Sequence, residues 1–209
     1  MRWLLFLLKN FSHMTPDREA KLSAVLNKRQ PDLTVVLENV FDPHNVSAVM
    51  RTCDCVGIQD IYVLNTRIAR HKNWGFKSSR SASKWVTVHQ FDDFETCMQT
   101  VRSKFQHIIT THLSDDAKDL YSMDFTQPMA LVFGNEQYGC TPEMIAAADG
   151  HLVIPQVGII QSLNISVACA VTVYEAFRQK RNAGHYNNAK LPQDQRHLLE
   201  LEWKMRYDR

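Results

Sequence analysis

Short apolar runs alternate with segments of helical spacing along most of this chain. The runs have the length of β-strands, are bounded by turn residues, and cover residues 33–38, 61–64, 85–89, 107–112, 129–133 and 151–155. Between them, apolar residues recur every three to four positions, as in helices, in segments that begin near residues 45, 91, 141 and 164. Strands that alternate with helices are typical of a parallel sheet covered on both faces, so we predict an α/β domain with a mostly parallel sheet.

Both ends of the chain have helical patterns. Thr15 in an N-cap position and Pro16 at the first helical position predict a helix within residues 14–30. The long helix that begins near residue 164 is expected to end at Gly184, and residues 187–209 contain a further amphipathic helix, "QRHLLELEWKMRYDR". We therefore predict one main domain over residues 31–186, between an N-terminal helix and a C-terminal helical tail.

The first thirteen residues imitate a targeting signal without meeting its requirements. Their apolar run from Trp3 to Leu8 is far shorter than the roughly 20 residues that span a membrane, and no small-residue cleavage site follows. We expect no membrane association. Two interpretations of residues 1–13 stay open: a non-native or disordered extension ahead of a start at Met14, or a native part of the chain.

Composition narrows the function without identifying it. The 209 residues are 44% apolar, which suffices for one core, and a net charge of +2 permits nucleic-acid binding without requiring it. The five cysteines are odd in number and contain no C-x-x-C pair and no zinc-finger spacing. We therefore predict no metal site and reduced thiols in a cytoplasmic protein.

Three loops that follow strands contain the candidate chemistry. Ligands of parallel sheets bind beyond the carboxyl ends of the strands, where "ENVFDPHNVSAVMRT", "FGNEQYGCTPEM" and "IPQVGIIQSLNIS" are expected to gather. The second loop has the glycine spacing of a phosphate-binding loop, but Cys140 stands where that motif needs a lysine. The third loop is largely apolar, which predicts that it is buried. A nicotinamide-dependent dehydrogenase is disfavoured, because the chain lacks an early G-x-G-x-x-G with an acidic residue about 20 positions later.

The motifs "NVSAVMRT", "GNEQYG" and "IPQVGIIQSLNISVACAVTVYEAFRQ" resemble, in this order and spacing, those of the SpoU/TrmH family of RNA ribose 2'-O-methyltransferases. The resemblance runs from about Gln30 to Tyr186 and is greatest to the TrmH branch, the tRNA guanosine 2'-O-methyltransferases that modify the D-loop. It implies a SPOUT-class α/β fold with a C-terminal deep trefoil knot. It also implies S-adenosylmethionine as cofactor, tRNA as partner and substrate, and a homodimer.

Individual positions match the family's functional residues. The resemblance assigns cofactor binding to Thr111, Gly134, Ile154 and Leu163, and catalysis to Asn45, Arg51, Glu136, Ser162 and Asn164. Each also has an ordinary interpretation: Asn164 caps a helix, Thr111 ends a strand, and Ile154 and Leu163 belong to a core.

The chemistry of the cofactor explains the missing lysine. S-adenosylmethionine has no phosphate and carries a positive sulfonium, so glycines that let the backbone approach are more useful than a cation. A protonated guanidinium has no lone pair, so we expect Arg51 to stabilise the developing alkoxide and hold a phosphate rather than act as the base. The proton then leaves to phosphate, water or Glu136.

Basic residues predict RNA contacts. No acidic residue occurs between Asp60 and Asp92, where basic side chains are interleaved with Trp74, Phe76 and Trp85, although the strand pattern favours Trp85 as a core residue. The predicted RNA-binding residues are Arg29, Arg67, Arg70, Lys72, Lys77, Arg80 and Arg178. Two alternatives stay open: a non-catalytic RNA-binding or RNA-assembly protein on the same scaffold, and a ribose methyltransferase for another tRNA or rRNA site.

Overall fold

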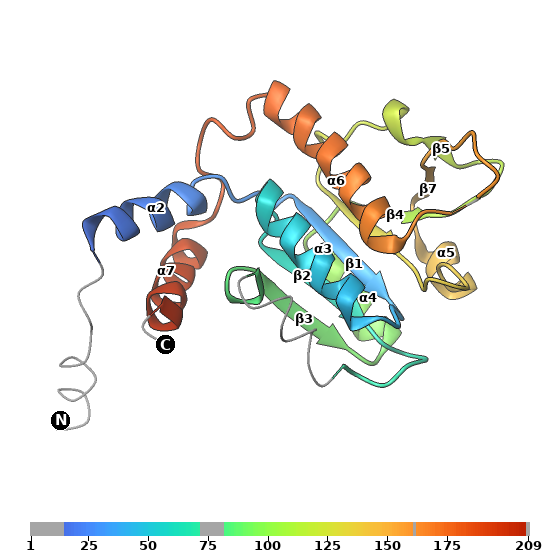
Figure 1. Ribbon diagram of the computed structural model, residues 1–209, viewed down its shortest axis with the longest axis horizontal. Coiled ribbons are helices and arrows are strands. Elements are labelled where there is room, and N and C mark those ends of the chain that lie inside the picture. The colour runs from blue at the N-terminus through green and yellow to red at the C-terminus, as the bar shows by residue number, and fades with distance from the viewer. Residues whose placement is uncertain (1–14, 72–81, 161, 208–209) are drawn as a thin grey trace.

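The computed structural model describes residues 15–71, 82–160 and 162–207 (Figure 1). In chain order the elements are α2 (Pro16–Leu26), β1 (Leu33–Glu38), α3 (Pro43–Val56), β2 (Asp60–Leu64), η1 (Ala82–Lys84), β3 (Thr87–Phe91), α4 (Phe94–Arg102), β4 (His107–Thr111), β5 (Lys118–Asp119), η2 (Leu120–Ser122), β6 (Met129–Phe133), α5 (Pro142–Ala147), β7 (Gly150–Val153), α6 (Ile165–Asn182) and α7 (Gln193–Tyr207).

The seven strands form one sheet in the order β3-β2-β1-β6-β4-β7-β5, and all its paired strands are parallel. This confirms the predicted α/β class. The chain adds β2 and β3 on one side of β1 and then crosses to the other side to build β6, β4 and β7. Such a reversal of strand order opens a crevice at the carboxyl ends of the strands, where ligands of α/β sheets bind.

Helices cover both faces of the sheet, as the alternation of strands and helices predicted. Alternate residues of β1 point to opposite sides: Val35 and Leu37 belong to a core shared with α3 and α6, whereas Val36 belongs to a core shared with α4 and α5. Figure 1 shows α3 and α6 next to each other across one face. Burial on both faces explains why β1 is a continuous apolar run rather than an alternating one.

Local sequence fixes where the helices begin and end. Asp42, Asp93 and Thr141 cap α3, α4 and α5, each accepting a hydrogen bond from a backbone N–H of the first turn. Pro16 begins α2, and α6 ends just before Gly184, whose φ of +79° favours glycine, as predicted.

Two strand predictions need correction. β3 begins at Thr87 rather than at residue 85, because the chain first makes the 3₁₀ turn η1. Trp85 lies between that turn and the strand and packs edge-on against Trp203 of α7, with ring centroids 5.3 Å apart. Strand β5, from Lys118 to Asp119, was not predicted because two residues are too few to form a periodic pattern.

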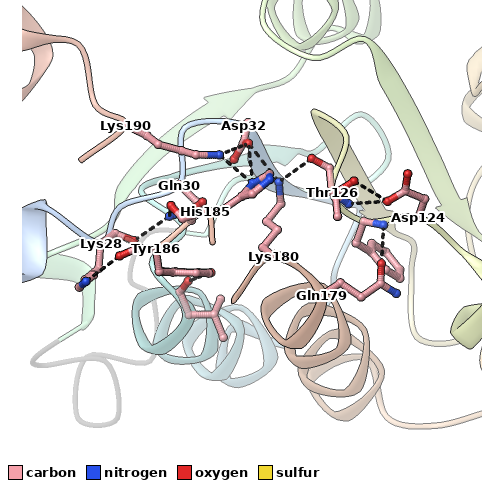
Figure 2. A network of polar contacts seen from close by, with 12 residues as sticks. Lys28, Gln30, Asp32, Asp124, Thr126, Gln179, Lys180, His185, Tyr186 and Lys190 are labelled. Atoms are coloured by element: carbon pink, nitrogen blue, oxygen red, sulfur yellow. Dashed lines mark hydrogen bonds and ion pairs between the residues drawn. The ribbon is translucent and has the colours of Figure 1, made fainter. Parts of the chain in front are cut away.

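A polar network connects the end of α6 and the chain that follows it to Asp32, the residue before β1 (Figure 2). The Asp32 carboxylate pairs with the Nζ atoms of Lys180 at 3.1 Å and Lys190 at 3.0 Å, and the Lys180 side chain is fully buried. Burial alone raises the pKa of Asp32, but the ammonium groups of Lys180 and Lys190 together outweigh it and hold this pKa below its ordinary value. Tyr186 adds a hydrogen bond of 2.7 Å from its hydroxyl to the Val56 carbonyl.

The prediction that Arg29 contacts RNA is wrong for this structure, because its side chain is fully buried. The guanidinium forms an ion pair of 2.7 Å with Asp54, donates to the Trp85 carbonyl at 3.1 Å and lies 5.1 Å from the ring centroid of Trp203. Leu22 and other apolar residues of α2 and α7 complete this cluster. Arg29 therefore joins the N- and C-terminal helices to the sheet domain.

Candidate active site

A cavity of about 760 Å³ lies beyond the carboxyl ends of β4, β6 and β7. The loops after these three strands and the first turns of α6 form its walls, as expected from their positions after neighbouring parallel strands. All four residues predicted to bind the cofactor, Thr111, Gly134, Ile154 and Leu163, line this first cavity.

The loop from Gly134 to Cys140 turns back sharply on itself. Asn135 and Gly139 form an antiparallel bridge, and the left-handed φ of Gly139, +68°, closes the turn. A Cβ atom on Gly134 would lie 2.1 Å from the carbonyl carbon of Gly139 and 2.2 Å from the backbone nitrogen of Cys140. Only glycine therefore fits at position 134, because the loop's own backbone occupies the space of a side chain.

Three predicted catalytic residues from distant parts of the chain form a hydrogen-bonded row. The Asn45 amide nitrogen donates to Glu136 Oε1 at 2.9 Å, and the Asn164 amide nitrogen donates to Asn45 Oδ1 at 3.2 Å. Glu136 and Asn164 line the first cavity. Asn164 also caps α6 by accepting from the Ser166 N–H at 2.9 Å, which confirms its ordinary interpretation as a helix cap.

The Glu136 carboxylate is surrounded by N–H donors. Besides Asn45, the backbone N–H groups of Phe41 and Asp42 donate to it at 2.9 and 3.1 Å. Burial on its own raises the pKa of Glu136, but the hydrogen bonds from Asn45 and the Phe41 backbone outweigh it and hold this pKa below its ordinary value. The carboxylate is thus a weak proton acceptor that fixes the loop between β1 and α3.

A second cavity of about 790 Å³ lies next to the first. The residues from Asn135 to Gln137, together with Gly139, line both cavities, so the turn after β6 is their common wall. Asn45 lines the second cavity, and Glu136 faces both. The sequence analysis missed this cavity and its exposed rings, Phe41 and Tyr138, although both rings occur in loops that follow strands.

The two remaining residues that were predicted to be catalytic, Ser162 and Arg51, differ in their positions relative to the cavities. Ser162 lines the first cavity and is exposed there. The prediction that its largely apolar loop is buried is wrong for this structure, because Val157 is 107% and Ile159 is 97% accessible. Arg51 lies on the solvent-facing side of α3 and lines neither cavity. Within the described part of the chain, it makes no hydrogen bond or ion pair.

Three of the predicted RNA-binding residues are exposed in this structure. Arg67 lines the second cavity, Arg70 pairs with Asp92 at 2.8 Å, and Arg178 pairs with Glu175 of its own helix at 2.7 Å. Lys72, Lys77 and Arg80, with the neighbouring Trp74 and Phe76, lie outside the described residues.

Within residues 15–71, 82–160 and 162–207, no three His, Cys, Asp or Glu side chains gather as a metal site would need. None of the helices in that part of the chain combines the length and hydropathy of a bilayer-spanning segment.

Comparison with known proteins shows the family. Residues 32–174 match the SpoU rRNA Methylase family. The tRNA (guanosine(18)-2'-O)-methyltransferase of Thermus thermophilus is 38% identical over 190 residues, which cover 90% of this chain and 96% of that protein.

Solved structures agree with the sequence match. The A. aeolicus TrmH/SpoU tRNA modifying enzyme superposes with a TM-score of 0.81 at 34% identity, over 91% of this chain and 96% of that chain. An AdoMet-bound rRNA methyltransferase from Sinorhizobium meliloti superposes with a TM-score of 0.65 at 25% identity, over 73% of this chain and 58% of that chain. Residues of the second and third motifs line the first cavity, and Asn45 of the first motif lines the adjacent second cavity. With this arrangement and its matching sequence and sheet, this chain belongs to the SpoU methylase family.

Proposed function

We propose that this chain transfers a methyl group from S-adenosylmethionine to a ribose 2'-hydroxyl of tRNA, at the D-loop guanosine, position 18 in the relative's name. One observation carries the proposal: Asn45, Glu136 and Asn164 form a hydrogen-bonded row where two adjacent cavities meet. A methyl donor in one cavity and a nucleotide in the other would meet at this row.

The first cavity suits the cofactor. Its volume of about 760 Å³ is in the range of small-molecule sites, and its walls combine backbone groups with apolar side chains such as Ile154 and Leu163. When bound, S-adenosylmethionine supplies a methyl carbon made electrophilic by its positive sulfur. The tight turn at Gly134 presents backbone to the ligand without adding a positive charge beside that sulfur. We further propose that the loops after β6 and β7 form the trefoil knot typical of SPOUT proteins, which is supported by their meeting around this cavity.

Glu136 acts as a positioning residue in this proposal. Its three N–H partners and lowered pKa disfavour proton uptake, so the ribose proton leaves to a substrate phosphate or to water. The carboxylate fixes the Asn45 amide, whose oxygen is held in turn by Asn164. Asn45 is thereby held at the junction of the cavities, where an amide can orient a hydroxyl.

A second copy of the chain completes the site. Arg51, expected to stabilise the alkoxide, lines neither cavity of its own chain and lies on the exposed side of α3. The neighbouring helix α6 exposes apolar side chains, with Val167 47% and Tyr174 50% accessible. A homodimer that buries these helices would cover the apolar side chains and bring Arg51 to the partner's cavities. Sedimentation at low micromolar concentration is expected to give about twice the chain mass of 24.1 kDa, and a mass near 24.1 kDa would contradict the dimer.

Exposed arginine side chains contact the phosphates of tRNA in this proposal. Arg67, Arg70 and Arg178 are accessible for phosphate contacts, whereas Arg29 is buried. With tRNA as substrate and five free cysteines, we place the protein in the cytoplasm.

The proposal is tested with purified protein, tritiated S-adenosylmethionine and an unmodified tRNA transcript. We expect tritium in the RNA, and nuclease digestion followed by mass spectrometry should recover it as 2'-O-methylguanosine from the D-loop. Cofactor binding without methyl transfer to any tRNA or rRNA would favour the non-catalytic alternative. Methyl transfer to a different nucleotide would support the proposed reaction but would show that the proposed target nucleotide is wrong.

A further inference from the structure

Two large aromatic rings that line the second cavity are exposed among the described residues. Phe41 is 71% and Tyr138 is 77% accessible, and both line this cavity. Their backbones are nevertheless fixed: the Phe41 N–H donates to Glu136 Oε2 at 2.9 Å, and the Tyr138 N–H donates to Asn135 Oδ1 at 3.1 Å. Exposed rings on fixed backbone are the usual platform on which proteins stack unpaired nucleobases.

The rest of the cavity also suits a nucleotide. Ile68 and Pro142 add apolar wall. Asn39, in the left-handed region with a φ of +53°, accepts hydrogen bonds from the backbone N–H groups of Thr66 and Arg67 at 2.9 and 2.8 Å. This contact holds the loop that carries Arg67, whose side chain lines the cavity and has no ion pair within the described residues. A cation, apolar walls and stacking rings together fit one planar base and its neighbouring phosphate.

The second cavity adjoins the proposed catalytic row, and this position indicates which part of the substrate binds in it. The methyl-accepting hydroxyl must lie close to the row formed by Asn45 and Glu136, in the wall between the cavities. The base is attached to the same ribose, so it has to enter the cavity that the cofactor leaves free. A base in a folded RNA can do this by leaving its stack, as in other enzymes that flip their target nucleotide.

We propose that the second cavity receives the nucleobase of the nucleotide whose ribose is methylated, stacked on Phe41 and Tyr138. This inference rests on the proposed ribose methylation and adds a binding site for the base. Stacking of one base on aromatic side chains corresponds to about a 5- to 150-fold effect on binding. The two rings should therefore favour a substrate that carries its base over one that lacks it.

The experiment compares two tRNA transcripts that differ only at position 18: one carries guanosine, the other an abasic ribose that keeps its 2'-hydroxyl. The ratio of kcat/KM for the two transcripts is measured for the wild-type chain, for Phe41→Ala, for Tyr138→Ala and for the matched control Tyr138→Phe. Cofactor affinity is measured in parallel. Both truncated rings are exposed, so the core does not change.

We expect the wild-type chain and Tyr138→Phe to prefer guanosine by about 5- to 150-fold, and each alanine variant to lose much of this preference with unchanged cofactor affinity. Equal losses on both transcripts, with an unchanged ratio, would overturn the base site while leaving ribose methylation intact. Absence of methyl transfer by the wild-type chain to either transcript would overturn both the base site and the proposed function.

Discussion

Replacing Glu136 by glutamine separates a positioning role from proton transfer. The substitution keeps the side chain's size but exchanges one acceptor oxygen for an NH₂ group. The Oε1 atom of Glu136 accepts from Asn45 and from the Asp42 N–H, and Oε2 accepts from the Phe41 N–H. Glutamine can keep the first two contacts only by turning its NH₂ group toward Phe41, where two donors would face each other.

The structure limits the size of the expected effect. At least one charge-assisted hydrogen bond is lost, and such bonds contribute about 1.5–3 kcal/mol when buried. Glu136 is exposed to solvent, which screens the interaction, so we expect about 1–2 kcal/mol. If this loss appears entirely as misplacement of Asn45 in the transition state, the rate falls about 5- to 30-fold. Removal of a general base would instead lower the rate by about 100- to 10,000-fold.

The assay is single-turnover methyl transfer to tRNA at saturating cofactor, measured from pH 5 to pH 9. We expect Glu136→Gln to lower the rate about 5- to 30-fold at every pH, without changing the shape of the profile. Asn45→Ala should give a loss of similar origin, and the double variant should lose less than the sum of the two effects, because these side chains are in contact. A loss of about 1,000-fold, within the range for removal of a general base, would show that Glu136 takes the proton and would refute this reasoning.

Substitutions at three further positions test other parts of the structure. Arg51→Ala should lower turnover about 100-fold or more while cofactor affinity stays within a few fold of the wild-type value. Arg51→Lys should also lose activity, because lysine lacks the planar guanidinium group. Half-maximal activity in Arg51→Ala would remove this residue from the mechanism. Gly134→Ala should weaken S-adenosylmethionine binding in calorimetric titrations at least about tenfold, because its Cβ would lie 2.1 Å from backbone, whereas the control Gly150→Ala, with its nearest neighbour at 3.6 Å, should bind normally. Because the folded-state pKa of Asp32 is lowered, its contribution to stability is present above the unfolded value of about 3.9 and is lost as pH falls through the folded value. Asp32→Asn, which leaves the buried Lys180 without this carboxylate, should therefore cost about 3 kcal/mol in urea unfolding at pH 7. This cost should decrease as the pH falls through the folded-state pKa of Asp32, and a cost that decreases at no acidic pH would contradict the ion pair.

The position of the first cavity could be predicted from the sequence, because it depends on the order of strands and loops along the chain. Gly134 and Ile154 follow parallel strands, so their meeting at one end of the sheet needed only the strand assignment. The cap at Asn164 was equally readable, since it involves only the next two residues. The strand assignment and the helix cap both depend on patterns among residues that are close in the sequence.

The errors concern contacts between distant segments. Arg29 has the sequence context of a surface residue, and its burial depends on Asp54 and on Trp203, which is 174 positions away along the chain. The second cavity was missed because Phe41 and Tyr138 lie in loops, where no periodic pattern marks a side chain as buried or exposed. The exclusion of Arg51 from both cavities of its own chain also depends on the direction in which α3 faces.

The central claim is that this chain methylates one particular oxygen. The most direct test offers the purified protein and tritiated S-adenosylmethionine two tRNAs, assembled from the same fragments, with guanosine or 2'-deoxyguanosine at position 18. We expect stoichiometric tritium incorporation into the first tRNA and none into the second, although both should bind with similar affinity. Equal incorporation into both tRNAs would place the methyl group elsewhere and contradict the account.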